Sequence, residues 1–145
     1  MTNEIKHNYV KILDRIKIAC KNSNRDPKGV EIIAICKRQP LLKIKKTINL
    51  GIQHFGENRI QDSHNRWKKI ETKSFKLTFV GPLQTNKSES AVELFDEIQS
   101  LDRVKLAQVL SKSEKKLKKR IKYMIQVNTG KEEQKSGIAP NEVEN

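Results

Sequence analysis

The stretch VEIIAICKRQP, residues 30–40, decides the fold class of this chain of 145 residues. Its first seven residues are nearly all apolar and rich in β-branched side chains, as expected for a strand of a parallel sheet that is covered on both faces. Pro40 suits the first turn of a helix, and the segment 41–51 supplies that helix, with Gly51 as its C-terminal cap. The stretch therefore predicts a parallel strand followed by a helix, with Lys37 where the strand ends.

The strand–helix pattern then repeats along the chain. Further strands are expected at 52–58, 75–81, 97–102 and 121–128, and further helices at 59–70, 85–95 (capped by Thr85) and 103–120, after a leading amphipathic helix at about 4–21. Five strands alternating with four helices over about 30–128 predict parallel βα units. Two architectures fit this pattern: an open doubly wound sheet, or the N-terminal part of a (β/α)8 barrel. The glycine-rich turn of a dinucleotide-binding sheet is missing from CKRQP, residues 36–40, which argues against a nucleotide cradle there.

The last segment, residues 129–145, is expected to be a loop followed by the start of a helix at Pro140. A single helical turn is not stable by itself. We therefore expect residues 1–145 to form one incomplete domain, cut off where its next helix begins.

The net charge of +13, from 30 basic and 17 acidic residues, raises nucleic acid as a partner. The densest basic block, KSEKKLKKRIK at 112–122, carries apolar residues at helical spacing, which is typical of a solvated helix face. Lysine outnumbers arginine and few aromatic residues interleave with the charge, so we expect no specific nucleic-acid binding, and incidental polyanion binding at low salt instead.

Other classes of protein are disfavoured by composition. No apolar run approaches the roughly 18 residues of a membrane span, and the N-terminus lacks a signal-peptide core, so we expect a cytoplasmic protein. Cys20 and Cys36 match no zinc spacing, and the three histidines, His7, His54 and His64, form no ligand pattern, so we expect no metal site.

Chemistry in parallel α/β proteins collects at the carboxyl ends of the strands. The residues expected there are Lys37, Glu57, Asn58, Gly81, Pro82, Gln84, Asp102, Arg103, Asn128 and Thr129. Lys37 is the most informative, because a lysine in apolar surroundings loses its proton more readily and the neutral amine can form a Schiff base with an aldehyde. The alternative is a lysine whose ammonium reaches solvent at a strand end. Cys36 is either a thiolate stabilised by its neighbours or a small packing residue.

Five motifs in order carry a family resemblance: IAICKRQP, GIQHFGENRIQD, FVGPLQTNK, IQSLDRVKLA and IQVNTGKEEQKSGI. Together they resemble the pyridoxal phosphate homeostasis protein family (YggS/PROSC type), over about residues 5 to 140. The resemblance implies a TIM-type (β/α)8 barrel similar to the N-terminal domain of alanine racemase. It also implies that pyridoxal 5′-phosphate is held as a Schiff base on Lys37, with Asn58 beside the cofactor and Gly81 to Lys87 shaping the barrel mouth.

Family members resemble carriers or regulators of the cofactor without established catalysis. The resemblance therefore implies two kinds of partner, pyridoxal phosphate itself and pyridoxal phosphate-dependent apoenzymes. It also implies that the full-length protein is a monomer. The alternatives are a racemase-type enzyme, which would need a second acid/base residue, and a basic nucleic-acid-binding module. Two departures stand out: Leu77 and Thr78 replace the family's usual Trp and His, and about five of eight βα units are present. In the family the later half carries the phosphate cup, so we expect residues 1–145 to be a truncated member that binds the cofactor weakly or not at all.

Overall fold

The computed structural model describes residues 2–71 and 74–143, with side chains from residue 4 onward. The helices are α1 (Thr2–Asn22), α2 (Leu41–Asn49), α3 (Ile60–Trp67), α4 (Ser88–Leu94) and α5 (Val104–Leu117). The strands are β1 (Ala34–Ile35), β2 (His54–Glu57), β3 (Lys76–Phe79), β4 (Glu97–Leu101) and β5 (Lys122–Ile125). Three short 3-10 turns, η1 (Pro27–Gly29), η2 (Thr85–Lys87) and η3 (Pro140–Glu142), complete the described elements.

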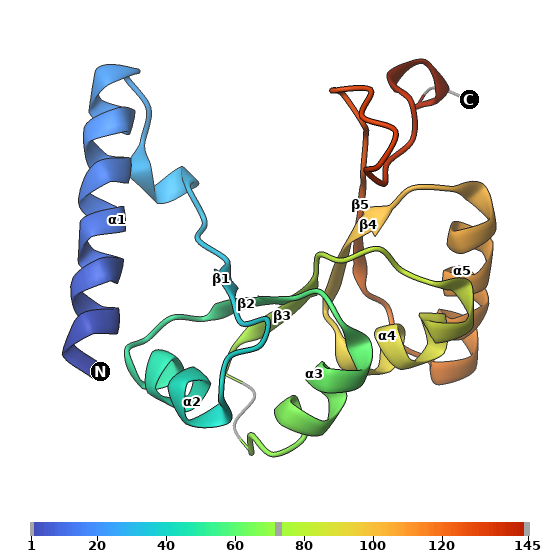
Figure 1. Cartoon of the computed structure of the whole chain (residues 1–145), viewed down its shortest axis with the longest axis horizontal. Helices are drawn as coiled ribbons and strands as arrows, with labels where there is room; N and C mark the ends of the chain where they lie inside the picture. Colours follow the sequence, from blue (N-terminus) through green and yellow to red (C-terminus); the bar gives the residue numbers. More distant parts are fainter. Residues whose placement is uncertain (1, 72–73, 144–145) are drawn as a thin grey trace.

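The five strands form one parallel sheet in the order β1-β2-β3-β4-β5. Each strand pairs with the one before it in the chain, whereas a doubly wound sheet reverses direction at a switch point. The order therefore decides between the two architectures in favour of a barrel segment. Helices α2 to α5 cover one face of the curved sheet, and α1 stands beside β1 (Figure 1). None of the helices in the described ranges is long and apolar enough to cross a membrane.

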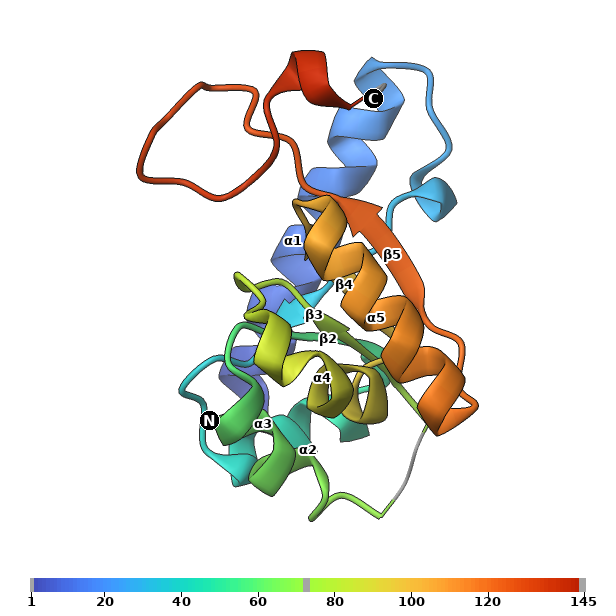
Figure 2. The same ribbon diagram turned by 90° about the vertical axis from the view of Figure 1, so that its right-hand side faces the viewer.

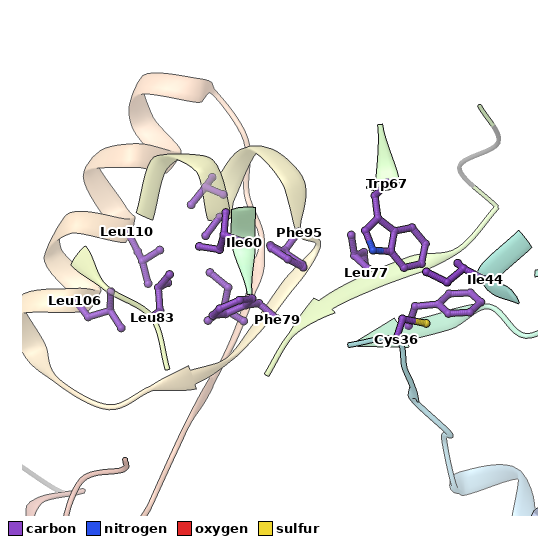
Figure 3. Packing of buried hydrophobic residues seen from close by; sticks show 14 of the residues in the cluster. Cys36, Ile44, Ile60, Trp67, Leu77, Phe79, Leu83, Phe95, Leu106 and Leu110 are labelled. Carbon is purple, nitrogen blue, oxygen red and sulfur yellow. The ribbon is translucent and has the colours of Figure 1, made fainter. Parts of the chain in front are cut away.

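The core lies between the sheet and these helices. Apolar side chains of the strands, such as Phe55, Phe79 and Ile98, are fully buried against the helices. Two parts of this core are visible in Figure 3: Trp67 beside Cys36, Ile44 and Leu77 on one side, and Ile60, Phe79, Leu83, Phe95, Leu106 and Leu110 on the other. Seen from the side, α4 and α5 lie together in front of the strands (Figure 2). The apolar residues that recur at helical spacing in the sequence thus lie on the helix faces that are buried against the sheet.

Two expectations about these elements were wrong in detail. The first strand has two residues rather than seven, and it is covered on one face only: Ile35 is 45% exposed on the face that the helices leave open. Among the described strands β1 pairs with β2 alone. Thr85 does not cap a helix, because it begins the 3-10 turn η2 and the residue before α4 is Lys87. At Pro140, where the start of a helix was expected, the described chain forms the 3-10 turn η3.

Polar side chains occupy the amino ends of the strands, on the face opposite the helices. The imidazole of His54 lies between two oxygens, with Nδ1 2.6 Å from Glu31 Oε1 and Nε2 2.6 Å from Thr78 Oγ1. Lys76 Nζ lies 2.6 Å from Glu97 Oε2 in the same layer. These hydrogen bonds join successive strands at the edge of the sheet remote from Lys37.

Candidate functional site

Lys37 lies in the turn between β1 and α2. The amide of Cys36 donates to the carbonyl of Gly56 at 2.8 Å, which extends the pairing of β1 with β2 by one residue, and the amide of Gln39 then closes the turn on Cys36 O at 3.0 Å. Cys36 is buried in the helix-covered core, whereas Ile35 and Lys37 on either side of it are exposed. This is the alternation of a strand, and it separates Lys37 from the packed side of the sheet.

The low-dielectric surroundings expected for Lys37 are not formed by the described residues, because its side chain is exposed. No acidic side chain in residues 4–71 or 74–143 forms an ion pair with the Lys37 amine. The amine is therefore accessible and free of a competing salt bridge.

The register of the sheet brings Asn58 and Gly81 to the same edge as Lys37. Ile35 pairs with Gly56, so Lys37, two residues on, is level with Asn58. Glu57 pairs with Phe79, which brings Gly81 to the same edge of the sheet. Gly81 touches Asn58 directly: a Cβ on Gly81 would lie 2.3 Å from the carbonyl oxygen of Asn58. Only glycine allows this close approach of the two chain segments. The sequence prediction that Asn58 and Gly81 share one edge with Lys37 therefore agrees with the backbone pairing.

The segment from Gly81 to Lys87 is anchored to the next βα loop. Leu83 is buried, and its carbonyl accepts a hydrogen bond of 2.8 Å from Arg103 Nη2. A cavity of about 610 Å³ lies between this segment and α3, with Asn58 in its wall. Of the predicted strand-end residues, Arg103 therefore holds the 81–87 segment, while the neighbouring Asp102 forms an ion pair with Arg103.

Asn128 and Thr129, which follow β5 by three and four residues, do not contribute to this arrangement in the same way. Asn128 organises its own loop, since its carboxamide donates to Glu132 O at 2.9 Å and accepts from Glu132 N at 3.2 Å. Thr129 is exposed. Gly137 packs on the backbone of Asn128 at a φ of +124°, a conformation that favours glycine.

Sequence reasoning missed a side chain that joins two of these strand ends. Arg66 of α3 donates through Nη1 to the carbonyl oxygens of Cys36 (3.1 Å) and Gln39 (2.7 Å), on both sides of the Lys37 turn. Its Nη2 lies 3.7 Å from Oε1 of Glu57, which also accepts a hydrogen bond of 3.0 Å from Trp67 Nε1. Burial raises the pKa of Glu57, while the Trp67 hydrogen bond and the Arg66 charge act in the opposite direction. Arginine at this helical position gives no sequence signal of its role.

The structure decides between the two interpretations of Cys36. Burial, followed by the nearby charge of Glu57, raises the pKa of its thiol to about 12. A thiol that stays protonated in the core is a packing residue, so the reactive-thiolate alternative is wrong. No group of three His, Cys, Asp or Glu side chains in the described part of the chain could hold a metal ion.

The basic block at 112–122 begins on the outer surface of α5. Leu106 and Leu110 of this helix are buried, while Lys112, Lys115 and Lys116 are exposed, and Lys116 Nζ lies 2.8 Å from a carboxylate oxygen of Glu89. The block follows the pattern of a solvated helix face.

The fold and site define a class: a parallel α/β barrel segment with an accessible lysine after its first strand. No family model matches the chain. Its sequence is 37% identical over 141 residues to the pyridoxal phosphate homeostasis protein of Haemophilus influenzae, covering 96% of this chain and 60% of that protein. The resemblance to the pyridoxal phosphate homeostasis proteins is thus confirmed, and the chain spans about 60% of the length of the relatives that it matches.

Solved structures agree on the fold. PipY of Synechococcus elongatus, determined with pyridoxal phosphate bound, superposes with a TM-score of 0.74 at 29% identity, over 87% of this chain and 58% of PipY. An alanine racemase of Clostridium difficile superposes with a TM-score of 0.66 at 15% identity, over 90% of this chain and 34% of the racemase, which shows likeness of fold alone. The predicted fold, part of a TIM-type barrel like that of alanine racemase, is therefore confirmed.

Proposed function

We propose that this chain binds pyridoxal 5′-phosphate through a Schiff base on Lys37 and acts in homeostasis of that cofactor as a carrier rather than as a catalyst. The observation that carries the proposal is the arrangement at one sheet edge: an accessible amine on Lys37, level with Asn58, whose backbone packs on Gly81. Sequence similarity to the pyridoxal phosphate homeostasis proteins and to PipY, which was solved with this cofactor, supports the same conclusion.

The residues present fit an aldehyde ligand. The cofactor would supply an aldehyde carbon to which the Lys37 nitrogen bonds, and the carbonyl oxygen leaves as water. Lys37 has no acidic partner among the described residues, so its amine can condense without first breaking an ion pair. The carboxamide of Asn58 carries both donors and acceptors for a polar ring substituent.

A carrier needs only reversible imine exchange, which one amine provides. Because Lys37 is exposed, a primary amine of another protein can reach the same carbon. We therefore propose that pyridoxal phosphate-dependent apoenzymes are the recipients of the cofactor, and that the protein works as a monomer.

The test is reductive trapping. The chain is mixed with excess pyridoxal phosphate, reduced with borohydride, digested, and analysed by mass spectrometry for the modified lysine. We expect preferential modification of Lys37 and its loss in Lys37→Ala, with unchanged labelling in Lys122→Ala, where an exposed lysine at the opposite end of a strand is removed. Because the trap is covalent, weak binding is still detected. Labelling spread evenly over the lysines would refute the proposal.

A further inference from the structure

One side chain of α3 holds the turn that carries Lys37. Arg66 Nη1 donates to the backbone carbonyls of Cys36 at 3.1 Å and Gln39 at 2.7 Å, which flank the turn residues Lys37 and Arg38. We propose that Arg66 is the positioning residue for Lys37, keeping its amine at the carboxyl edge of the sheet. This inference rests on the proposed function of Lys37.

The turn needs such support because its backbone is strained. Arg38 has a φ of +58°, in the left-handed region that is unfavourable for a residue with a side chain. Conformations of this kind persist where surrounding contacts hold them. The turn's own backbone supplies the hydrogen bond from Gln39 N to Cys36 O. Arg66 adds two hydrogen bonds from a separate helix, so removing it leaves a strained turn with less to oppose relaxation.

Arg66 is itself fixed in place. Its side chain is 13% exposed, and Nη2 lies 3.7 Å from Glu57, whose carboxyl group is 1% exposed and is oriented by the Trp67 indole. Glu57 immediately precedes Asn58 at the end of β2. One guanidinium thus links the Lys37 turn to the strand end that bears Asn58, and its planar set of donors suits two carbonyls and a carboxylate together.

The expected effect follows from the loss of these contacts. Losing the two hydrogen bonds from Arg66 should lower the equilibrium ratio of ordered to disordered turn by roughly five- to tenfold. The share of trapped cofactor found on Lys37, relative to the other lysines, should fall as well, by at most about that factor. Arg66→Lys keeps a cation with several donors and should recover part of the loss.

The experiment compares Arg66→Met, Arg66→Gln and Arg66→Lys with a matched control, Lys68→Met, which removes an exposed cation two residues further along. Borohydride trapping with pyridoxal phosphate gives the share of label on Lys37. Amide hydrogen exchange at Gln39, measured by NMR without cofactor, reports the order of the turn independently. Circular dichroism and thermal unfolding check the fold.

The proposal predicts faster exchange at Gln39 and a smaller Lys37 share in Arg66→Met and Arg66→Gln, partial recovery in Arg66→Lys, and no change in Lys68→Met. Unchanged exchange and labelling in a folded Arg66 variant would overturn it. Unfolding of both the Met and Gln variants would also overturn it, because Arg66 would then support the whole fold rather than this turn. If the unmodified chain shows no preference for Lys37 while exchange at Gln39 still responds to Arg66, the proposed function fails and the contact with the turn stands.

Discussion

The contact between Gly81 and Asn58 gives a sharp test of how the site edge is built. In Gly81→Ala the new Cβ would lie 2.3 Å from the carbonyl oxygen of Asn58 and 2.9 Å from its carbonyl carbon and its Cα. Ordinary contacts between such atoms are about 3.5 Å, so the two segments would have to separate by roughly 1 Å. The obstructing atoms are all backbone, which cannot rotate away. We therefore expect the substitution to lower the free energy of unfolding by about 2–3 kcal/mol, in the upper part of the range for overpacking.

Urea unfolding followed by circular dichroism measures this effect. With a denaturant slope of about 2 kcal/mol/M, the midpoint should fall by roughly 1 M or more. Gly29→Ala is the matched control, because a Cβ there meets nothing within 4 Å and the φ of Gly29 is not positive. It should change stability by at most about 0.5–1 kcal/mol, in the stabilising direction. Equal midpoints for the two variants would refute the reasoning that Gly81 is required by its approach to Asn58.

Three further predictions concern buried groups. His54→Ala removes hydrogen bonds to Glu31 and to the fully buried Thr78, and should cost about 2–4 kcal/mol in urea unfolding, against less than about 0.5 kcal/mol for the exposed His7→Ala. Burial raises the pKa of the Cys36 thiol to about 12, so Cys36 should resist iodoacetamide at pH near 8 until urea unfolds the chain. Rapid alkylation of Cys36 in the folded chain would contradict this. Burial raises the pKa of Glu57 above its ordinary 4.5, so the stability that this group contributes is full below that pH and is lost as pH rises through the folded value. Unfolding midpoints of the unmodified chain should therefore fall relative to those of Glu57→Gln as pH rises from 4.5 to neutrality, and a constant difference would contradict the shift.

The features that the sequence predicted well are those recorded in local patterns. The alternation of apolar strands with amphipathic helices placed all five strands and their parallel order, because side-chain periodicity reports the burial of each element directly. The position of Lys37 after an apolar strand followed from the same pattern. Asn58 and Gly81 followed from it too, as strand-end residues, and the family motifs added their expected places beside the cofactor and at the barrel mouth.

The features that the sequence did not predict depend on contacts between distant segments. The run 30–36 was expected to be buried on both faces, yet Ile35 is exposed, because burial of a strand face depends on what packs over it and not on the strand itself. Arg66 lies thirty residues from Cys36 in the chain, and an arginine on a helix flank is usually solvated. Thr85 has the right chemistry for a cap, but the chain tightens into a 3-10 turn before α4 begins.

Position and environment of Lys37 therefore have separate origins. Its position is set within this chain, by the pairing of Cys36 with Gly56 and by the hydrogen bonds from Arg66. Its environment is not, since the side chain and that of Ile35 beside it are exposed on the face that α2 to α5 leave uncovered. Changes to Arg66 should consequently alter where the amine is presented.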